Sequence, residues 1–578
     1  MGARVAIDEL VDSARRRTSS PWVLATVLAL PAFVPLVAHY VGFAMAGRWP
    51  TGFIMYDAPY YVANARELFD SGHFGLLYGN PFSYDHATPR IYFQPLTLIL
   101  GVLLWMSRGD PGLVFAAVGV VAAIVCGRVA VALFDHFGDR SKPGGLMTFI
   151  AFFWGGGLVV LAATVFVAVV LGAGAGRSGF DVAAWWSFIR VVDPAGGWWF
   201  LNLGRNLVLP TEAVYHALFF GGVVLILARR FASAAAVAAV LSLSHPFTGL
   251  QFLAIVGGWA LLESILRSRV VPRWFLACII ALGVLHATYY LVFLPRFSEH
   301  RQLQAQWMLA WNLTIPEIVL AYGVVASFAL WRIGTRERFR HVISQWPNRL
   351  LLVWLVASLG LENHELFVRN AVQPIHFTRG YSWVALFLLG LPVIAELFRR
   401  TRMSGHRAVA WLAPAVVAVV FVVDNAVWLG ATATQNLGLS LGRTLPPDPS
   451  RAGYGLSRDQ VQVLKFMNDP SVRGSVVLSE DLDLGYLATV YSPLRSWRSH
   501  YANTPWNRER LGELRAFFAN GQVVDAWRHL GLVVVFRSTT AWRDRASGLQ
   551  ELPVSPVVEN RSYVVIHIQP RRPGALQP

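Results

Sequence analysis

Charged residues and cysteine are scarce in this 578-residue chain. Only 14% of the residues are charged, whereas 55% are hydrophobic and the mean hydropathy is +0.48. Soluble domains need more charge than this to cover their surface, so a string of water-soluble globules is excluded and most of the length is expected to lie in lipid. The two cysteines, Cys126 and Cys278, lie inside apolar runs, which excludes a disulfide scaffold or a cysteine metal site.

Acidic residues are fewer than basic ones, and the net charge is +16. In a soluble protein this excess would suggest a nucleic-acid partner, but no basic stretch here is interleaved with aromatic residues on one soluble unit, so no nucleic acid is expected. Most arginines instead flank the ends of apolar runs. Loops on the cytoplasmic side of a membrane are rich in arginine, so the positions of these arginines predict which loops face the cytoplasm. Five clusters follow this pattern: Arg15–Arg17, Arg229–Arg230, Arg267–Arg273, Arg332–Arg340 and Arg399–Arg407.

Apolar runs able to cross about 30 Å of hydrocarbon recur up to about residue 430. The first, Pro21 to Met45, lacks a small-residue cleavage site, so we expect a retained anchor with residues 1–20 in the cytoplasm. If 145–173 crossed as one helix, every later arginine cluster would lie on the extracytoplasmic side. A break at Gly155–Gly157 divides this run into two helices, which returns the clusters to the cytoplasmic side and gives about thirteen helices in total. The other runs lie near 94–106, 111–134, 208–229, 232–244, 248–266, 274–295, 314–331, 349–361, 381–398 and 408–430.

The sequence changes character after Pro446-Pro447. Strand-like runs at 475–478, 532–536 and 563–568 alternate with helical stretches such as 507–519, which predicts a small α/β domain. The expected fold is an α-helical polytopic membrane protein with a C-terminal extracytoplasmic α/β domain. Its predicted parts are the cytoplasmic 1–20, a transmembrane domain over 21–430 with an outer loop at 46–93, and the α/β domain over 431–578.

The outer loop at 46–93 carries the first candidate for chemistry. Asp57 precedes a stretch from Pro59 to Gly72 in which apolar residues recur at helical spacing. Capping of this helix would explain a short acidic side chain at that position. A carboxylate at the membrane surface could equally accept a proton from, or orient, an incoming nucleophile during group transfer. The loop alone leaves both interpretations open.

The motifs of this loop resemble the GT-C superfamily of polytopic glycosyltransferases. They are Asp57 after the first span, Tyr60-Tyr61 and Ala65-Arg66 in the helix, and the entry Tyr92-Phe93-Gln94-Pro95 to the next span. The superfamily includes the protein mannosyltransferases, the aminoarabinose transferases and the oligosaccharyltransferase catalytic subunits. The resemblance implies inverting sugar transfer from a polyprenyl-phosphate donor, with Asp57 as the catalytic carboxylate and Tyr60 and Tyr61 near the substrate. Many members have a second acidic residue where this chain has Ala58, which argues against a metal pair.

The resemblance extends over most of the chain at lower specificity. Ser244-His245-Pro246 is similar to a His-Pro turn in bacterial and archaeal relatives. The stretches 478–486 and 500–505 are similar to the extracytoplasmic domain of uncharacterised members, which usually have glycine where this chain has Ser499. The match supports the superfamily and no particular subfamily.

A lipid-phosphate donor requires cationic partners at the level of the headgroups. By the predicted topology, Arg369, His376 and Arg379 lie together in one short outer loop, and Arg205 lies in another. Outward arginines at a membrane edge can also be snorkelling anchors. We interpret these four residues as the donor phosphate-binding group.

Five further residues are candidates for substrate binding. Glu212 and His216 form an i, i+4 pair on a helix that enters the membrane. They could bind an acceptor, stabilise the helix or hold a metal, but no third ligand is identifiable, so a divalent metal is possible and metal-independent chemistry is favoured. His245 could instead satisfy backbone groups at a helix break, and His300 and Arg301 could belong to an exposed charged turn.

Two other polar or aromatic groups have simple structural interpretations. Glu480-Asp481-Leu482-Asp483 follows a strand, where acidic residues cap helices, although a metal-binding motif can look similar. Four tryptophans of the loop 175–206 suit an interfacial aromatic belt, although their faces also suit sugar rings. They are Trp185, Trp186, Trp198 and Trp199.

These patterns favour a membrane glycosyltransferase. The expected partners are a polyprenyl-phosphate sugar, membrane lipid, and a glycan, lipid or protein acceptor. The scarcity of lysine beside many arginines suggests a GC-rich coding bias, hence a bacterial cytoplasmic membrane. Two alternatives stay open: a transporter or flippase of a lipid-linked substrate, and an inactive GT-C scaffold in cell-envelope assembly. A transporter would place ionisable groups near mid-membrane, whereas here they are expected at the outer ends of spans.

Overall fold

The chain forms two compact units, each assembled from separated segments. Unit 1 comprises 1–38, 117–288 and 309–447, and unit 2 comprises 39–116, 289–308 and 448–578. The predicted division at residues 20 and 430 stays a prediction. Arg15–Arg17, Trp198 and Trp199 and the C-terminal tail lie outside the described residues. This computed structural model describes residues 20–70, 75–85, 87–142, 144–171, 180–192, 202–308, 312–403, 407–437, 454–549 and 555–569.

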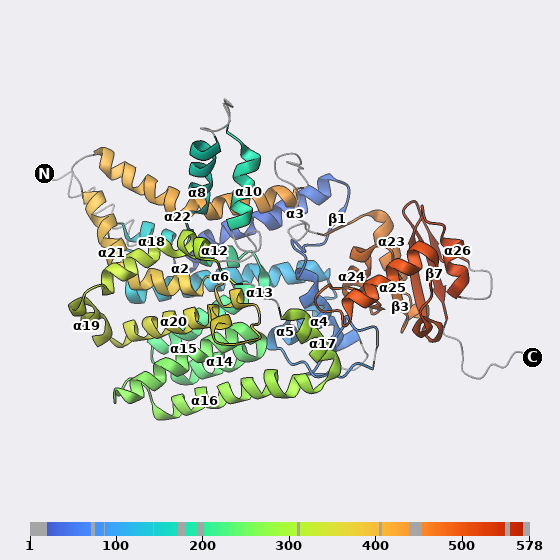
Figure 1. Ribbon diagram of the computed structural model, residues 1–578, viewed down its shortest axis with the longest axis horizontal. Helices are drawn as coiled ribbons and strands as arrows, with labels where there is room; N and C mark the ends of the chain where they lie inside the picture. Colours follow the sequence, from blue (N-terminus) through green and yellow to red (C-terminus); the bar gives the residue numbers. More distant parts are fainter. Residues whose placement is uncertain are drawn as a thin grey trace, which may run out of the picture. The chain divides into compact units, whose positions relative to one another are not determined.

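Helices make up most of the described residues, and the longest of them are apolar, as the hydropathy predicted (Figure 1). Among the described residues, seven helices are long and apolar enough to cross a membrane, which makes the protein a multi-pass membrane protein. The count of about thirteen spans and their orientation stay predictions. The seven are Pro21–Met45 (α2, η1 and α3), α6 (Pro111–Phe137), α13 (Pro210–Leu227), α15 (Pro246–Ile265), Arg273–Arg296 (α16 with the turns that follow), α18 (Ile315–Ile333) and Tyr381–Arg400 of α21 (Tyr381–Met403).

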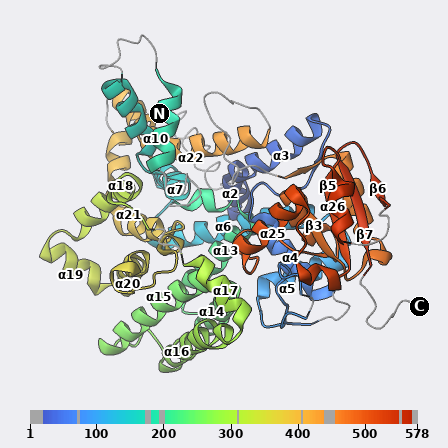
Figure 2. The ribbon, with the colours of Figure 1, turned by 45° about the vertical axis from the view of Figure 1, so that its right-hand side comes forward.

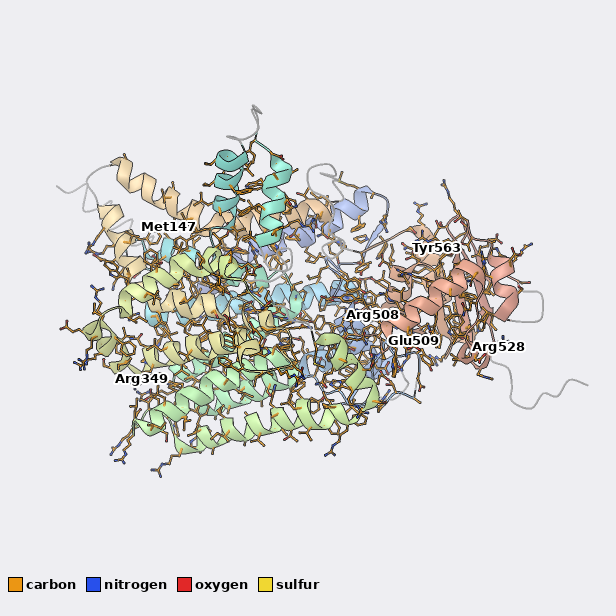
Figure 3. The ribbon with its side chains drawn as sticks, viewed as in Figure 1. Met147, Arg349, Arg508, Glu509, Arg528 and Tyr563 are labelled. Carbon is orange, nitrogen blue, oxygen red and sulfur yellow. The ribbon has the colours of Figure 1, made fainter. Side chains whose placement is uncertain are left out.

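Short connections make sequential helices of unit 1 neighbours. α14 (Phe231–Ser244) packs between α13 and α15, and α15 also packs on α16 and on α20 (Trp346–Glu362) (Figure 2). Arg349 of α20, labelled in Figure 3, lies at the arginine-rich end of this group. It makes a two-pronged ion pair with Glu263 of α15, with N···O distances of 2.6 and 2.8 Å. The fork of the guanidinium matches the carboxylate and ties the two helices together.

The run 145–173 breaks at the glycine triplet, as the arginine parity predicted. α7 (Gly145–Trp154) and the segment Val159–Val169, which begins with α8 (Val159–Val165), meet at 81°. A Cβ at Gly157 would lie 2.1 Å from the carbonyl oxygen of Leu320, so only glycine fits there. The first two backbone N–H groups of α8 donate to the carboxylate of Asp424 at 3.1 and 2.9 Å. Asp424, on α22 (Arg407–Asn436), thus satisfies groups that a helix break inside lipid would otherwise leave unpaired.

Unit 2 contains the segment after the first span, α17 (Ser298–Trp307) and the C-terminal α/β domain. The sheet of this domain consists of β3 (Val476–Ser479), β4 (Arg495–Ser496), β5 (Leu532–Arg537), β6 (Val558–Glu559) and β7 (Tyr563–Ile568). Their order is β4-β3-β5-β7-β6, with β3 parallel to β4 and β5 and with β7 antiparallel to β5 and β6. The three predicted strands and the predicted helix, α25 (Asn507–Asn520), are confirmed, whereas the two-residue β4 and β6 are too short for a sequence pattern.

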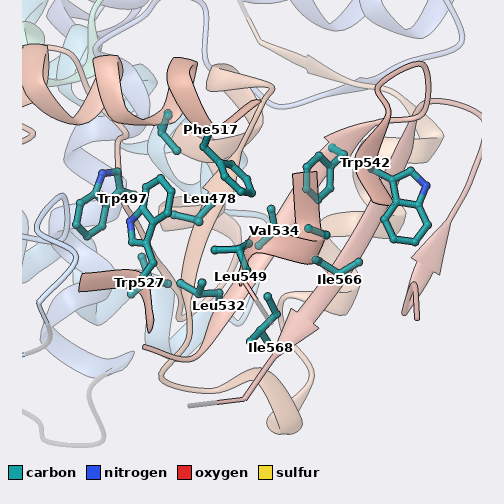
Figure 4. Close-up of a cluster of buried hydrophobic side chains, with 14 of the residues drawn as sticks. Leu478, Trp497, Phe517, Trp527, Leu532, Val534, Trp542, Leu549, Ile566 and Ile568 are labelled. Carbon is teal, nitrogen blue, oxygen red and sulfur yellow. The ribbon is translucent and has the colours of Figure 1, made fainter. Parts of the chain in front are cut away.

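Large aromatic side chains fill the core of the α/β domain (Figure 4). Phe517 of α25 and Trp527 of η9 (Asp525–His529) pack edge to face with ring centroids 5.4 Å apart, against Val534 of β5 and Ile566 of β7. β3 is buried along its whole length and β5 up to Phe536, which explains their unbroken runs of apolar residues.

The acidic motif 480–483 caps a helix, as predicted. Asp481 precedes α24 (Leu482–Tyr491) and accepts hydrogen bonds from the backbone N–H groups of Asp483 and Leu484 at 3.1 Å. Its second oxygen accepts from the hydroxyl of Tyr563 at 2.5 Å, and Glu480 accepts from the backbone of Arg537. Capping and sheet contacts therefore account for this motif.

The segment after the first span and the α/β domain belong to one unit although some 400 residues separate them. β1 (Trp49–Pro50) pairs antiparallel with β2 (Gly455–Leu456), and α4 (Ala58–Asp70) packs on α24. Glu67 of α4 forms an ion pair with Arg495 of β4 at 2.6 Å, and both side chains are nearly buried. These contacts fix the position of Asp57 relative to the α/β domain.

Candidate functional site

Asp57 lies immediately before α4, and its backbone carbonyl accepts from the N–H of Tyr60 at 3.2 Å. Its side chain turns to His500 of the α/β domain, whose Nε2 lies 2.9 Å from Asp57 Oδ1. The carboxylate is 60% exposed, whereas the His500 side chain is 3% exposed. An accessible carboxylate is therefore hydrogen-bonded to a buried imidazole.

Aromatic rings enclose His500. Tyr501 stacks on it at 15° with centroids 5.3 Å apart, and Tyr56, Tyr60, Phe82 and Tyr486 lie between 5.0 and 5.8 Å from it. The hydroxyl of Tyr56 accepts from the backbone N–H of Tyr501 at 3.0 Å. Burial raises the pKa of Tyr56 and of Tyr501 to about 12, so both phenols are neutral near pH 7.

The two predicted tyrosines face different surroundings. Tyr60 stacks on Phe82 at 14° and borders His500, so it lies beside the Asp57 pair. Tyr61 stacks on Phe115 of α6 instead. Tyr60 therefore belongs to the surroundings of the Asp57–His500 pair.

His300 does not belong to an exposed charged turn, so that interpretation is wrong for His300. It follows Glu299 on the same helix. They lie on α17, where Glu299 accepts from Asn80 and Thr88 at 2.8 and 2.9 Å. His300 is buried, its Nδ1 lies 3.1 Å from the hydroxyl of Tyr92, and burial lowers its pKa to about 4. Arg301 is exposed and donates to backbone carbonyls of the preceding turn. The contacts of Glu299 and His300 hold Asn80, Thr88 and Tyr92 against α17.

A buried polar network in unit 1 joins four of the predicted site residues. The guanidinium of Arg379 forms an ion pair with Glu212 of α13 and a hydrogen bond with His376 Nδ1. The two ring nitrogens of His216 face carbonyl oxygens, that of Glu212 at 2.7 Å and that of Arg379 at 2.6 Å. Both ring nitrogens of His216 thus face carbonyl groups of this network.

Arg205 belongs to a neighbouring network. It lies on α12 (Leu203–Asn206), donates from Nε to Asn425 Oδ1 at 2.8 Å and lies over the ring of Trp428. Gly380, at φ +78°, packs against α12 so closely that a Cβ would lie 3.0 Å from the carbonyl of Asn202. The loop that carries Arg379 therefore lies beside the helix that carries Arg205.

The remaining predicted residues lie apart from this network or have structural contacts. Arg369 is exposed. His245 caps α15, because its Nδ1 accepts from the N–H of Thr248 at 3.2 Å, which agrees with the structural interpretation. Trp186 of α10 (Val182–Val192) is buried against α8, so it is a core residue and no part of an exposed belt. Among the described residues, no group of three or more His, Cys, Asp or Glu side chains is arranged to hold a metal ion.

Solved structures of an oligosaccharyltransferase from Archaeoglobus fulgidus are similar to this chain. AglB in complex with an inhibitory peptide and a dolichol-phosphate aligns over 89% of this chain and 69% of that chain, with 12% identity and a TM-score of 0.42. The apo form aligns over 92% and 71%, with 12% identity and a TM-score of 0.43, and the complex with zinc and sulfate over 90% and 68%, with 13% and 0.40. No family model and no curated protein matches the chain.

Two residues of these sites were not predicted from the sequence as functional candidates. His500 lies 443 residues from Asp57, and its motif was noted only as part of a resemblance. Asp424 lies inside an apolar run, where an acidic residue is itself a signal of a buried partner.

Proposed function

We propose that this protein is a membrane glycosyltransferase of the GT-C type, which transfers a sugar from a polyprenyl-phosphate donor to an extracytoplasmic acceptor. The observation that carries the proposal is the exposed Asp57 carboxylate, held by the buried imidazole of His500 within a group of aromatic side chains. A carboxylate in that setting is suited to accept a proton from a hydroxyl, and tyrosine faces suit the apolar faces of sugar rings.

The proposed reaction is a single displacement with inversion. The acceptor hydroxyl gives its proton to Asp57 while its oxygen forms a bond to the anomeric carbon. The bond between that carbon and the phosphate oxygen breaks, and polyprenyl phosphate leaves with the electron pair. Orientation of the acceptor and removal of its proton would supply the acceleration.

We also propose that four residues bind the leaving phosphate: Arg369, Arg379, His376 and Arg205. Arg379 is charge-balanced by Glu212, so an incoming phosphate would have to compete with that carboxylate or share the guanidinium with it. We also propose that seven further residues contact the substrate: Tyr60, Tyr61, Glu212, His216, His245, His300 and Arg301.

The proposed location is a bacterial cytoplasmic membrane, with the α/β domain on its extracytoplasmic side.

One observation favours a second function, transport or flipping of a lipid-linked substrate. Glu212 and His216 are buried ionisable groups in a helix long and apolar enough to span the membrane, and such groups mark many transport pathways. Their ion pair and hydrogen bonds within unit 1 give them a structural role as well, so we favour the transferase.

The test presents the purified protein in lipid with a panel of radiolabelled polyprenyl-phosphate sugars and membrane extract as the source of acceptor. Transfer of label to an acceptor supports the proposal and identifies the sugar. Movement of donor across a sealed vesicle without transfer would establish the transporter, and donor binding with neither activity would establish an inactive scaffold.

A further inference from the structure

The two ring nitrogens of His500 have different hydrogen-bond partners. Nδ1 lies 3.1 Å from the backbone N–H of Ala502 and 3.0 Å from Nδ2 of Asn503. The Ala502 N–H is a donor whichever way the Asn503 amide is turned, so Nδ1 must accept and the ring proton belongs on Nε2. Nε2 then donates to Asp57 Oδ1 at 2.9 Å. The local backbone therefore selects the tautomer that binds the carboxylate.

The position of this imidazole is fixed on several sides. The carbonyl of His500 accepts from the N–H of Thr504 at 2.9 Å, which closes a tight turn. From α17, Trp307 Nε1 donates to the carbonyl of Ala502 at 2.9 Å and Gln306 donates to that of Thr504 at 3.2 Å. The ring itself is buried and stacked on Tyr501. A donor held this firmly restricts the rotation of the carboxylate that it binds.

We propose that His500 is a positioning residue for Asp57: its Nε2–H holds Oδ1 and leaves Oδ2 directed at the acceptor hydroxyl. This inference rests on the proposed function. The acceptor proton passes to Oδ2, and His500 neither gains nor loses a proton during transfer. The α/β domain thereby supplies part of the reaction centre, because the carboxylate follows the first span and its orienting partner lies far along the chain.

The first test needs no activity. The full-length protein, labelled with nitrogen-15 at histidine and reconstituted in lipid nanodiscs, gives ring-nitrogen signals by NMR, and those of His500 are identified by their loss in His500→Gln. We expect the His500 proton on Nε2, with a changed Nε2 signal in Asp57→Leu. A proton on Nδ1, or an Nε2 signal that does not respond to Asp57→Leu, would overturn the inference.

The second test separates positioning from packing by a pair of substitutions. His500→Gln retains an N–H group near the place of Nε2, whereas His500→Phe retains an aromatic ring without a donor. Loss of a hydrogen bond to a charged group should lower kcat of His500→Phe about 10- to 100-fold while KM for the donor changes less than about 3-fold. His500→Gln should recover most of kcat.

The matched control is His529→Phe, since His529 is an exposed histidine on η9 of the same domain; it should transfer at the wild-type rate. Equal losses of kcat in His500→Gln and His500→Phe would mean that His500 acts only through packing and would overturn the inference. Wild-type kcat in His500→Phe would overturn it as well, while the proposed function would stand. If the wild-type protein transfers no sugar, the proposed function fails, and the nitrogen-15 spectrum alone then decides whether His500 holds Asp57.

Discussion

The buried ion pair between Glu212 and Arg379 allows a quantitative test of the unit 1 network. Both side chains are less than a tenth exposed, and the Arg379 guanidinium also forms a hydrogen bond with His376. Replacing one partner by leucine leaves the other charge buried without its counter-ion. Such a loss costs about 3–5 kcal/mol, whereas replacing both partners by apolar residues is often close to neutral.

We therefore expect Glu212→Leu and Arg379→Leu each to lower the free energy of unfolding by about 3–5 kcal/mol, and the double variant to lose less than either one. Reversible unfolding in mixed micelles, followed by tryptophan fluorescence, measures all four corners of this cycle. The matched control is the exposed pair Glu396 and Arg399 on α21, whose removal should leave the unfolding transition unchanged. Additive losses in the double variant, or single losses below about 1 kcal/mol, would refute the reasoning.

Three further predictions concern contacts inside one unit or the other. Asp424→Ala should cost about 1–2 kcal/mol of unfolding free energy, because it leaves two N–H groups at the start of α8 without an acceptor, and Asp424→Asn should cost less; equal losses in the two variants would contradict this role. Phe517→Ala should cost about 3–5 kcal/mol in the same unfolding assay, because the ring fills the α/β core, and a loss below about 1 kcal/mol would contradict the packing. His300 should make stability fall by up to about 3 kcal/mol as the pH drops from about 6.5 to about 4. Its pKa is about 4 in the folded protein and near 6.5 in the unfolded chain, so the unfolded chain binds the proton first; the drop should shrink in His300→Phe, and an unchanged pH profile there would contradict the assignment.

The helices and the main strands could be predicted from the sequence, because hydrophobic patterning alone indicates them. Long apolar runs predicted the helices, and strings of valine predicted β3, β5 and β7, because burial on both faces of a sheet requires uninterrupted hydrophobic residues. The break at Gly155–Gly157 followed from the positions of the arginines, which reflect the two sides of the membrane. Its stabilising partner, Asp424, did not follow, because contacts between distant helices leave no periodic trace.

The candidate site was predictable only in part for the same reason. Asp57 was identified by its place after the first span, and Asp481 was correctly interpreted as a cap from its place after a strand. Arg379 and His376 were expected to be near each other and are hydrogen-bonded, but their link to Glu212 crosses 167 residues. The contact between Asp57 and His500 crosses 443 residues, so local spacing could not reveal it.

The central claim is that Asp57 accepts the proton of the acceptor in sugar transfer. The most direct test compares wild-type protein, Asp57→Asn and Asp525→Asn in one transfer assay with a donor that the wild type uses. Asp525 is a fully exposed carboxylate of the α/β domain and serves as the control. We predict that Asp57→Asn remains folded and inserted but loses about 10²–10⁴-fold in kcat, while Asp525→Asn matches the wild type. Undiminished transfer by folded Asp57→Asn would contradict the claim.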